Sequence, residues 1–264
     1  MRIVALGLLL ASAGTATVSS IPFTTAHEGR VVVSARAAGD VPLKVILDTG
    51  AGLDVFAPTL IAKLGGKPAG QFTGFPMSGE RLDLPLFVIP ELSIGPLVKK
   101  DALVGSWEVL DEPHREGVID GIVSLNYFRD QPFTFDFVNK VIVFESPQSL
   151  EQRRAAGQVS PLQLHDQRGI ALDVFAQFLI GDRQGQCEID TGSPRATMST
   201  RYLASPGTDA VPLLALAASP RIGVAKPQVS FKNIIYDCVI GVDFWAGKIV
   251  TIDIPGRRLI VAFR

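Results

Sequence analysis

The feature that most constrains this 264-residue chain is that its sequence repeats itself. A Leu-Asp-Thr-Gly segment at 47–50 recurs as Ile-Asp-Thr-Gly at 189–192. Two later blocks, 120–128 and 133–144, recur 117 residues further on, whereas the Asp-Thr-Gly segment recurs 142 residues further on. The second copy is therefore 25 residues shorter between its first two blocks. A duplication with one deletion explains this pattern, and it predicts two similar structural units.

Both copies carry the pattern of β-strands. The segments 30–34, 43–47, 84–89 and 133–144 are rich in Val, Ile and Phe and are bounded by Gly, Pro, Asn or Asp. A short helix is expected at 58–64, because this stretch begins with a proline and stops at two glycines. With 25 Gly and 18 Pro residues and few helical patterns, the chain is predicted to be all-β.

Composition excludes several classes of function. Hydrophobic residues make up 47% of the chain and charged residues 19%, so it can bury a sizeable core. Lys and Arg together number 25 against 26 for Asp and Glu, a net charge of −1, which excludes a generally basic nucleic-acid binder. The three histidines are scattered, and two cysteines are too few for a cysteine-based zinc site, so no metal site is expected.

The first residues are predicted to be a targeting signal. A short positive start, an apolar run at 3–10 and small residues after it are typical of a secretory signal peptide at 1–16, cleaved after Ala13 or Ala16. The alternative is a buried first strand. The apolar run is shorter than the ~20 residues that cross a bilayer. We therefore expect an exported protein, periplasmic or secreted, with no membrane span after signal removal.

The two Asp-Thr-Gly triplets are the candidate site. A single triplet is best explained as a tight turn, in which Asp caps backbone amides and Gly takes a positive φ. Two triplets at equivalent places in a repeat favour a shared role for Asp48 and Asp190. Each follows an apolar strand and precedes a small residue, Ala51 or Ser193.

These residues resemble a known family. The segments 47–51 and 189–193 look like the active-site loops of aspartic proteases, and 122–124 and 239–241 look like the strand that locks against each loop. The chain is similar to retropepsin-like proteases that carry both lobes in one chain, as in exported bacterial forms. The resemblance implies two similar β-barrel-like lobes of the acid-protease fold with the active site in the cleft between them. It divides the chain as follows: N-terminal lobe 28–145, linker 146–161, C-terminal lobe 162–264.

The resemblance implies an aspartic endopeptidase that acts on polypeptides as a monomer without a cofactor. Two neighbouring carboxylates share one proton, so one of Asp48 and Asp190 would activate water while the other binds the scissile carbonyl. The family also implies support of the two loops by the residues that follow each aspartate: Thr49, Gly50, Thr191 and Gly192. The alternative is a catalytically silent module that binds peptides in the same cleft. Two intact triplets favour the enzyme.

The resemblance further implies a flap over the cleft. The segment 72–79 is the candidate, with Gly74, Phe75 and Pro76 as substrate-binding residues, and its alternative is an ordinary hairpin turn. The second copy lacks a comparable segment, which favours the silent module. Pro194 also lacks the N–H that the first copy has at the matching position.

The resemblance finally brings the strands of Cys187 and Cys238 side by side. Export would permit a disulfide between them, and it would close a loop of about 50 residues. The alternative is two small buried residues in neighbouring strands.

Overall fold

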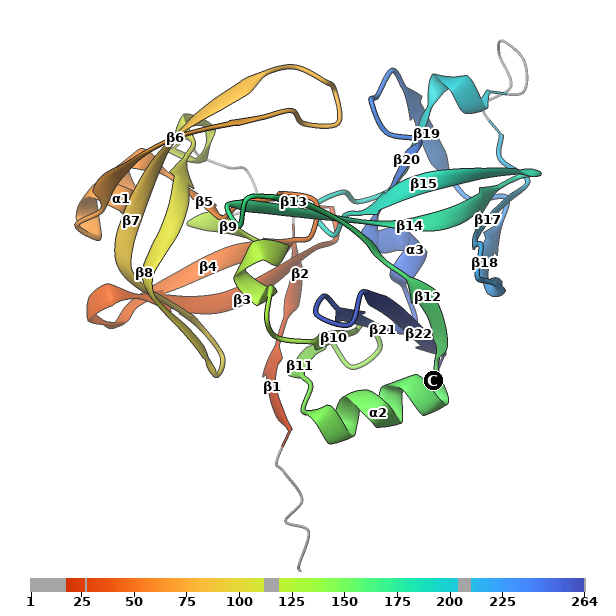
Figure 1. Cartoon of the computed structure of the whole chain (residues 1–264), viewed down its shortest axis with the longest axis horizontal. Helices are drawn as coiled ribbons and strands as arrows, with labels where there is room; N and C mark the ends of the chain where they lie inside the picture. The colour runs from red at the N-terminus through yellow and green to blue at the C-terminus, as the bar shows by residue number, and fades with distance from the viewer. Residues whose placement is uncertain (1–17, 27, 112–118, 204–209, 264) are drawn as a thin grey trace, which may run out of the picture.

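The computed structural model describes residues 18–26, 28–111, 119–203 and 210–263. The predicted signal peptide at 1–16, with both of its possible cleavage points, lies outside the described residues. Figure 1 shows two lobes built of curled β-sheets, with a third sheet below them. The predicted all-β class with two barrel-like lobes is confirmed.

The N-terminal lobe is one eight-stranded sheet in the order β2-β3-β4-β9-β5-β8-β7-β6. A further pairing of β3 with β7 curls the sheet toward a barrel. Alternate residues of β3 are fully buried, as a half-buried strand requires. Its strands are β2 (Thr24–Ala26), β3 (Arg30–Ala37), β4 (Val41–Asp48), β5 (Val55–Phe56), β6 (Lys67–Gly74), β7 (Leu82–Ile94), β8 (Leu97–Ser106) and β9 (Gly121–Ser124).

The C-terminal lobe repeats this plan with eight strands. Its order is β18-β17-β14-β15-β20-β16-β19, and β13 pairs with β14 beside this path. In each lobe, the strand that precedes the Asp-Thr-Gly triplet pairs in parallel with a strand from the second repeated block, β4 with β9 and β15 with β20. The strands are β13 (Gln163–Gln167), β14 (Ala171–Ile180), β15 (Arg183–Ile189), β16 (Ala196–Ser199), β17 (Leu213–Leu216), β18 (Ser219–Ala225), β19 (Val229–Lys232) and β20 (Cys238–Ile240).

The third sheet joins the two copies of the repeat. Its order is β1-β11-β10-β21-β22-β12, so the last hairpin of each copy lies in one sheet. Thr134 of β10 stands opposite Thr251 of β21, and their hydroxyl oxygens are 2.7 Å apart in the buried interior. Equivalent residues of the two copies therefore meet. The strands are β1 (Ser19–Pro22), β10 (Phe133–Asp136), β11 (Val141–Phe144), β12 (Gln158–Pro161), β21 (Lys248–Asp253) and β22 (Arg258–Phe263).

The few helices are short. The helix expected at 58–64 is present as α1 (Pro58–Lys63), which starts with its proline and is followed by Gly65 at a φ of 71°. The others are α2 (Pro147–Ala156) and α3 (Val242–Trp245), with 3₁₀ turns η1 (Ala38–Asp40), η2 (Glu108–Asp111), η3 (Leu125–Phe128) and η4 (Thr200–Tyr202).

The segment expected to be a linker, 146–161, has regular structure. Ser146 starts α2 with a reciprocal capping box to Ser149, and β12 then pairs with β22 in the third sheet. The segment is polar because α2 buries no residue fully, and this composition is typical of a linker. Strand β12 was not expected because its pairing partner, β22, lies a hundred residues further along the chain.

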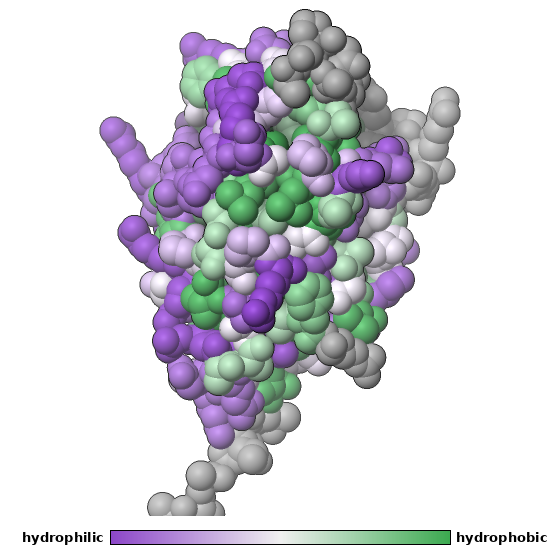
Figure 2. Space-filling model, turned by 90° about the vertical axis from the view of Figure 1, so that its right-hand side faces the viewer, coloured by the Kyte–Doolittle hydropathy of each residue, from purple (hydrophilic) through white to green (hydrophobic). Residues whose placement is uncertain are grey.

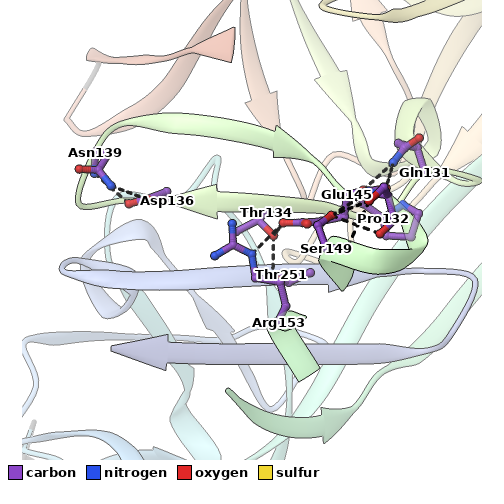
Figure 3. A network of polar contacts seen from close by, with 10 residues as sticks. Gln131, Pro132, Thr134, Asp136, Asn139, Glu145, Ser149, Arg153 and Thr251 are labelled. Carbon is purple, nitrogen blue, oxygen red and sulfur yellow. Dashed lines mark hydrogen bonds and ion pairs between the residues drawn. The ribbon is translucent and has the colours of Figure 1, made fainter. Parts of the chain in front are cut away.

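A buried carboxylate ties α2 to the third sheet (Figure 3). Glu145 is 5% exposed, and its Oε1 accepts hydrogen bonds from Thr134 Oγ1 at 2.6 Å and from Arg153 Nε of α2 at 2.9 Å. Its backbone carbonyl accepts a bond from the Gln131 side chain. Because a buried charge must be paired, Arg153 makes α2 part of the folded core rather than an independent connector.

Large apolar side chains are mostly inside, and the surface is mixed. Figure 2 shows hydrophilic and hydrophobic residues interspersed on the face that lies to the right in Figure 1. Exposed large apolar residues include Phe75 at 56% and Ile235 at 50%, which belong to different lobes. In the described part of the chain, no helix has the length and apolar character to cross a bilayer.

Candidate functional site

The structure brings the two Asp-Thr-Gly loops together where the lobes meet. Asp48 is the last residue of β4, and Asp190 directly follows β15. A Cβ added to Gly50 would stand 2.6 Å from Cγ of Asp190, and one added to Gly192 would collide with the Asp48 carboxylate. Only glycine allows each backbone to approach the opposite carboxylate this closely.

Two buried threonines hold the loops in register. The Thr49 amide donates to Thr191 Oγ1 at 3.1 Å, and the Thr191 amide donates to Thr49 Oγ1 at 2.9 Å. Each hydroxyl also donates across the junction, that of Thr49 to Ile189 O at 2.6 Å and that of Thr191 to Leu47 O at 2.7 Å. Both hydroxyls are therefore fully used in joining the lobes.

The two carboxyl groups are half-buried and hydrogen-bonded to backbone amides. Gly50 N donates to Asp48 Oδ1 at 2.9 Å, and Asp190 Oδ1 accepts from the amides of Gly192 at 2.7 Å and Ser193 at 3.0 Å. Burial raises the pKa of Asp48. Burial raises the pKa of Asp190 well above its ordinary value, and the neighbouring Asp48 charge raises it further. Because two adjacent carboxylates disfavour double ionisation, the pair retains a shared proton.

Two further acidic residues, Asp173 and Glu188, lie close to the pair, and no motif in the sequence marked them. Burial raises the pKa of Asp173 to about 6, and burial together with its acidic neighbours raises the pKa of Glu188 well above its usual value. A Cβ at Gly52 would lie 2.8 Å from Asp173 Oδ1, so this residue approaches the first loop from the other lobe. One signal was available, because Glu188 lies near the end of β15, only two positions before Asp190.

Ser124 has a specific partner. Asp54 Oδ1 accepts hydrogen bonds from Ser124 N at 2.7 Å and Ser124 Oγ at 2.8 Å. Burial raises the pKa of Asp54 to about 6, against the lowering effect of these bonds. The Ser124 hydroxyl thus helps to lock β9 against the segment that follows the first Asp-Thr-Gly triplet.

The candidate flap reaches the opposite lobe. Gly74 ends β6, and Phe75 and Pro76 begin the turn to β7. The contact itself is made further along: the Ile235 amide donates to Met77 O at 2.9 Å, and a Cβ at Gly79 would lie 2.7 Å from the Ile235 side chain. In Figure 1 this hairpin extends from the N-terminal lobe toward the β19–β20 connection.

A pocket of about 720 Å³ opens beside Asp190 beneath this contact. Met77 lines it from the flap, and the remaining lining comes from the β2–β3 turn, the start of β3 and the C-terminal lobe. Its lining residues are Glu28, Arg30, Met77, Asp190, Gly192, Ser193, Pro194, Arg195, Thr197, Ser230 and Lys232. Pro194 is thus part of the pocket wall, where it offers no N–H.

Cys187 and Cys238 form a disulfide. They stand opposite one another in the parallel pairing of β15 and β20, with Cα atoms 4.5 Å apart. The bond lies three residues before Asp190 and reinforces the strand pair that carries it. Across the residues that the structure describes, no three His, Cys, Asp or Glu side chains are grouped to hold a metal ion.

Comparison with known proteins finds similarity in three dimensions only. No protein-family profile matches the chain, and no curated protein sequence matches it. Among solved structures, basic 7S globulin from soybean matches with a TM-score of 0.61 at 10% identity, over 93% of this chain and 94% of that one. Conglutin gamma, a basic 7S globulin from lupine seeds, matches with a TM-score of 0.59 at 10% identity over 94% and 95%. The structure of edgp matches with a TM-score of 0.61 at 10% identity over 94% and 95%.

These matches correct the sequence-based assignment. The neighbours are globulins rather than retropepsin-like proteases, so the retropepsin-like assignment was wrong. The endopeptidase activity and the hydrolase, protease and aspartyl protease classes that it implied were wrong with it. The physical reason lies in the triplets themselves. Thr49, Thr191 and the two glycines join the lobes whether or not the aspartates act on a substrate, so the triplets by themselves do not establish hydrolysis.

Proposed function

We propose that this protein binds an extended polypeptide segment in the cleft beside Asp48 and Asp190 and releases it uncleaved. The observation that carries the proposal is the half-buried carboxyl pair at the lobe junction, next to a pocket of about 720 Å³ that a flap residue helps to line. Similarity to globulins rather than proteases favours binding over hydrolysis.

The carboxyl pair has the chemistry to hold a peptide group. A pair that shares one proton presents an O–H donor and a carboxylate acceptor side by side. A peptide group presents the complementary C=O and N–H. Because both pKa values are raised by burial, the proton stays on the pair at pH values where an exposed aspartate has lost it. Asp48 and Asp190 are then ligand-binding residues, with the Thr and Gly residues after them as supports.

The candidate flap residues would form the roof of the cleft. Phe75 is 56% exposed and is available to a ligand, while Gly74 and Pro76 shape the turn that carries it. Strand β6 is the edge of its sheet, so an extended ligand gains main-chain hydrogen bonds there. The single flap suits one-sided closure over a peptide.

Export belongs to the same proposal. The disulfide between Cys187 and Cys238 supports an oxidising compartment, periplasmic or extracellular, and the segment 1–16 would direct the chain there. The functional unit is a monomer, since both lobes of the cleft come from one chain.

Peptide binding is tested with a library of acetylated, amidated decapeptides. The purified protein is incubated with the library at pH 5 and pH 7, and bound peptides are recovered and analysed by mass spectrometry. We expect an enriched set of intact peptides, and weaker binding by Asp48→Asn and Asp190→Asn. Asp101→Asn, which changes an exposed aspartate on β8, is the matched control. New peptide termini that disappear in Asp48→Asn would show hydrolysis and overturn the proposal, as would the absence of any enriched peptide.

A further inference from the structure

The pocket beside Asp190 gathers positive charge. Three of its lining residues are cationic, namely Arg30, Arg195 and Lys232. Arg30 donates to Gly192 O at 2.6 Å and lies 4.0 Å from the carboxylate of Glu28, so it belongs to the loop structure. Within the described ranges, no carboxylate lies within 4.0 Å of the charged groups of Arg195 or Lys232.

Strand pairing places a threonine and a serine between these two cations. In the parallel pairing of β16 with β19, Thr197 stands opposite Ser230. Lys232 is the last residue of β19, two positions after Ser230, so these two residues share a face of the strand. Arg195 lies in the bend directly before β16, two positions before Thr197. All four line the pocket.

The pocket floor supplies a hydroxyl donor. Thr197 Oγ1 and Ser230 Oγ are 2.9 Å apart, and either can be the donor. Such a pair uses one hydroxyl hydrogen for its own bond, which leaves the other hydrogen for an acceptor on a ligand. A hydroxyl between an arginine and a lysine suits an anionic oxygen.

Acidic side chains outside the pocket lining also lie near the carboxyl pair. Asp173 and Glu188 are both near enough to Asp48 for its charge to raise their pKa after burial has done so. Neither of them lines the pocket, so the three cations and these two acids surround the pair separately. The chain as a whole has a net charge of only −1, so this distribution of charge is local.

We infer that the pocket lined by Arg195, Thr197, Ser230 and Lys232 is a carboxylate-binding subsite, which selects peptides that place an anionic group there. The inference rests on the proposed peptide binding. The carboxylate comes either from an Asp or Glu side chain or from the C-terminus of the peptide, since both present the same two oxygens. Pro194 and Met77 complete the wall around the hydrocarbon part of that residue.

Three forms of one selected decapeptide test the subsite. The first carries Glu at one position and an amidated C-terminus, with the position scanned along the peptide; the second carries Gln there. The third carries Gln and a free C-terminal carboxylate. Fluorescence anisotropy gives each Kd. We expect one position at which Glu binds about fivefold tighter than Gln, the upper range for a solvent-exposed charge pair. If only the free C-terminus gives the gain, the subsite takes chain ends.

Variants locate the charge that makes the difference. Lys232→Gln should remove most of the preference for Glu over Gln, and Lys232→Glu should reverse it, so that the Gln peptide binds more tightly than the Glu peptide. Arg195→Gln should have a similar effect, although the Arg195 charge also acts on Asp243, so Lys232 is the cleaner test. The matched controls are Lys226→Gln and Arg221→Gln, exposed cations of the same lobe outside the pocket lining, which should leave the preference unchanged.

The two proposals fail in different ways. If Glu and Gln peptides bind equally at every position and no free terminus helps, the subsite is refuted while peptide binding stands. Equal losses in the Lys232 and Lys226 variants would also refute it, because the effect would then be general electrostatic attraction. If none of the three forms binds the unmodified protein, peptide binding itself is refuted.

Discussion

The threonine pair at the lobe junction predicts a large loss of stability from a very small change. Thr49→Val keeps the shape of the side chain and removes only the hydroxyl. In the folded protein that hydroxyl accepts from Thr191 N at 2.9 Å and donates to Ile189 O at 2.6 Å, and Thr49 has no exposed surface. Valine would leave the N–H of Thr191 and the C=O of Ile189 buried without this hydrogen-bond partner.

The magnitude follows from those two groups. Leaving a buried polar group without its hydrogen bond costs roughly 1–3 kcal/mol, so we expect the free energy of unfolding to fall by about 3 kcal/mol. Thr191 makes the equivalent bonds, to Thr49 N and Leu47 O. Thr191→Val should therefore lower the free energy of unfolding by a similar amount, to within about 1 kcal/mol.

Urea denaturation followed by circular dichroism measures this change. The matched control is Thr24→Val, the same substitution at an exposed position of β2, which should stay within about 0.5 kcal/mol of the unmodified protein. If Thr49→Val changes stability no more than Thr24→Val does, the hydroxyl bonds do not stabilise the junction. The structural explanation for the two triplets would then be wrong.

Three further predictions concern buried charge and the cross-link. Arg153→Ala should lower the free energy of unfolding by about 3–5 kcal/mol, because it leaves the buried Glu145 carboxylate without its cationic partner. Restored stability in the double variant with Glu145→Gln would support this cause, and a loss below about 1 kcal/mol in Arg153→Ala would contradict it. Burial raises the pKa of Asp54 to about 6 in the folded protein, against an ordinary value of 3.8, so folding takes up a proton between these pH values and stability falls as pH rises from about 4 to 6. Urea titrations from pH 4 to 7 should show a fall in the free energy of unfolding that is about 2 kcal/mol smaller in Asp54→Asn, and identical pH profiles would refute the shift. Cys187→Ala/Cys238→Ala opens a loop with a sequence separation of 51, so calorimetry should show a loss of about 4 kcal/mol by chain entropy, and an unchanged Tm would speak against a disulfide in solution.

Much of the secondary structure follows from local sequence. The Val-, Ile- and Phe-rich segments became strands, and the proline and glycines around 58–64 placed α1 to within one residue. The predicted linker at 146–161 contains regular structure, α2 and β12, that its local sequence did not indicate. Its strand β12 depends on β22 of the other copy, and no local pattern reveals a partner that distant in sequence.

The site was predictable only where the repeat exposed it. Asp48 and Asp190 stood out because they occur twice, and the structure brings them together. No repeated motif distinguishes Asp54, Asp173 and Glu188. Burial raises the pKa of all three, and neighbouring acids raise those of Asp173 and Glu188 further, and both causes depend on tertiary packing. The flap contact through Met77 likewise joins segments more than a hundred residues apart.

The sequence by itself determined that the chain is all-β, that it is built from two copies, and that two aspartates occupy equivalent places. These properties follow from strand periodicity and turn residues, which are local patterns, and from the repeat, which is found by comparing one half of the sequence with the other. Only the tertiary structure decided that the last hairpins merge into one sheet, that further acidic residues and a basic pocket lie close to the carboxyl pair, and that the triplets bind the lobes together. Activity was misjudged from the motifs because the same residues that could serve chemistry also satisfy the hydrogen bonds of a buried junction.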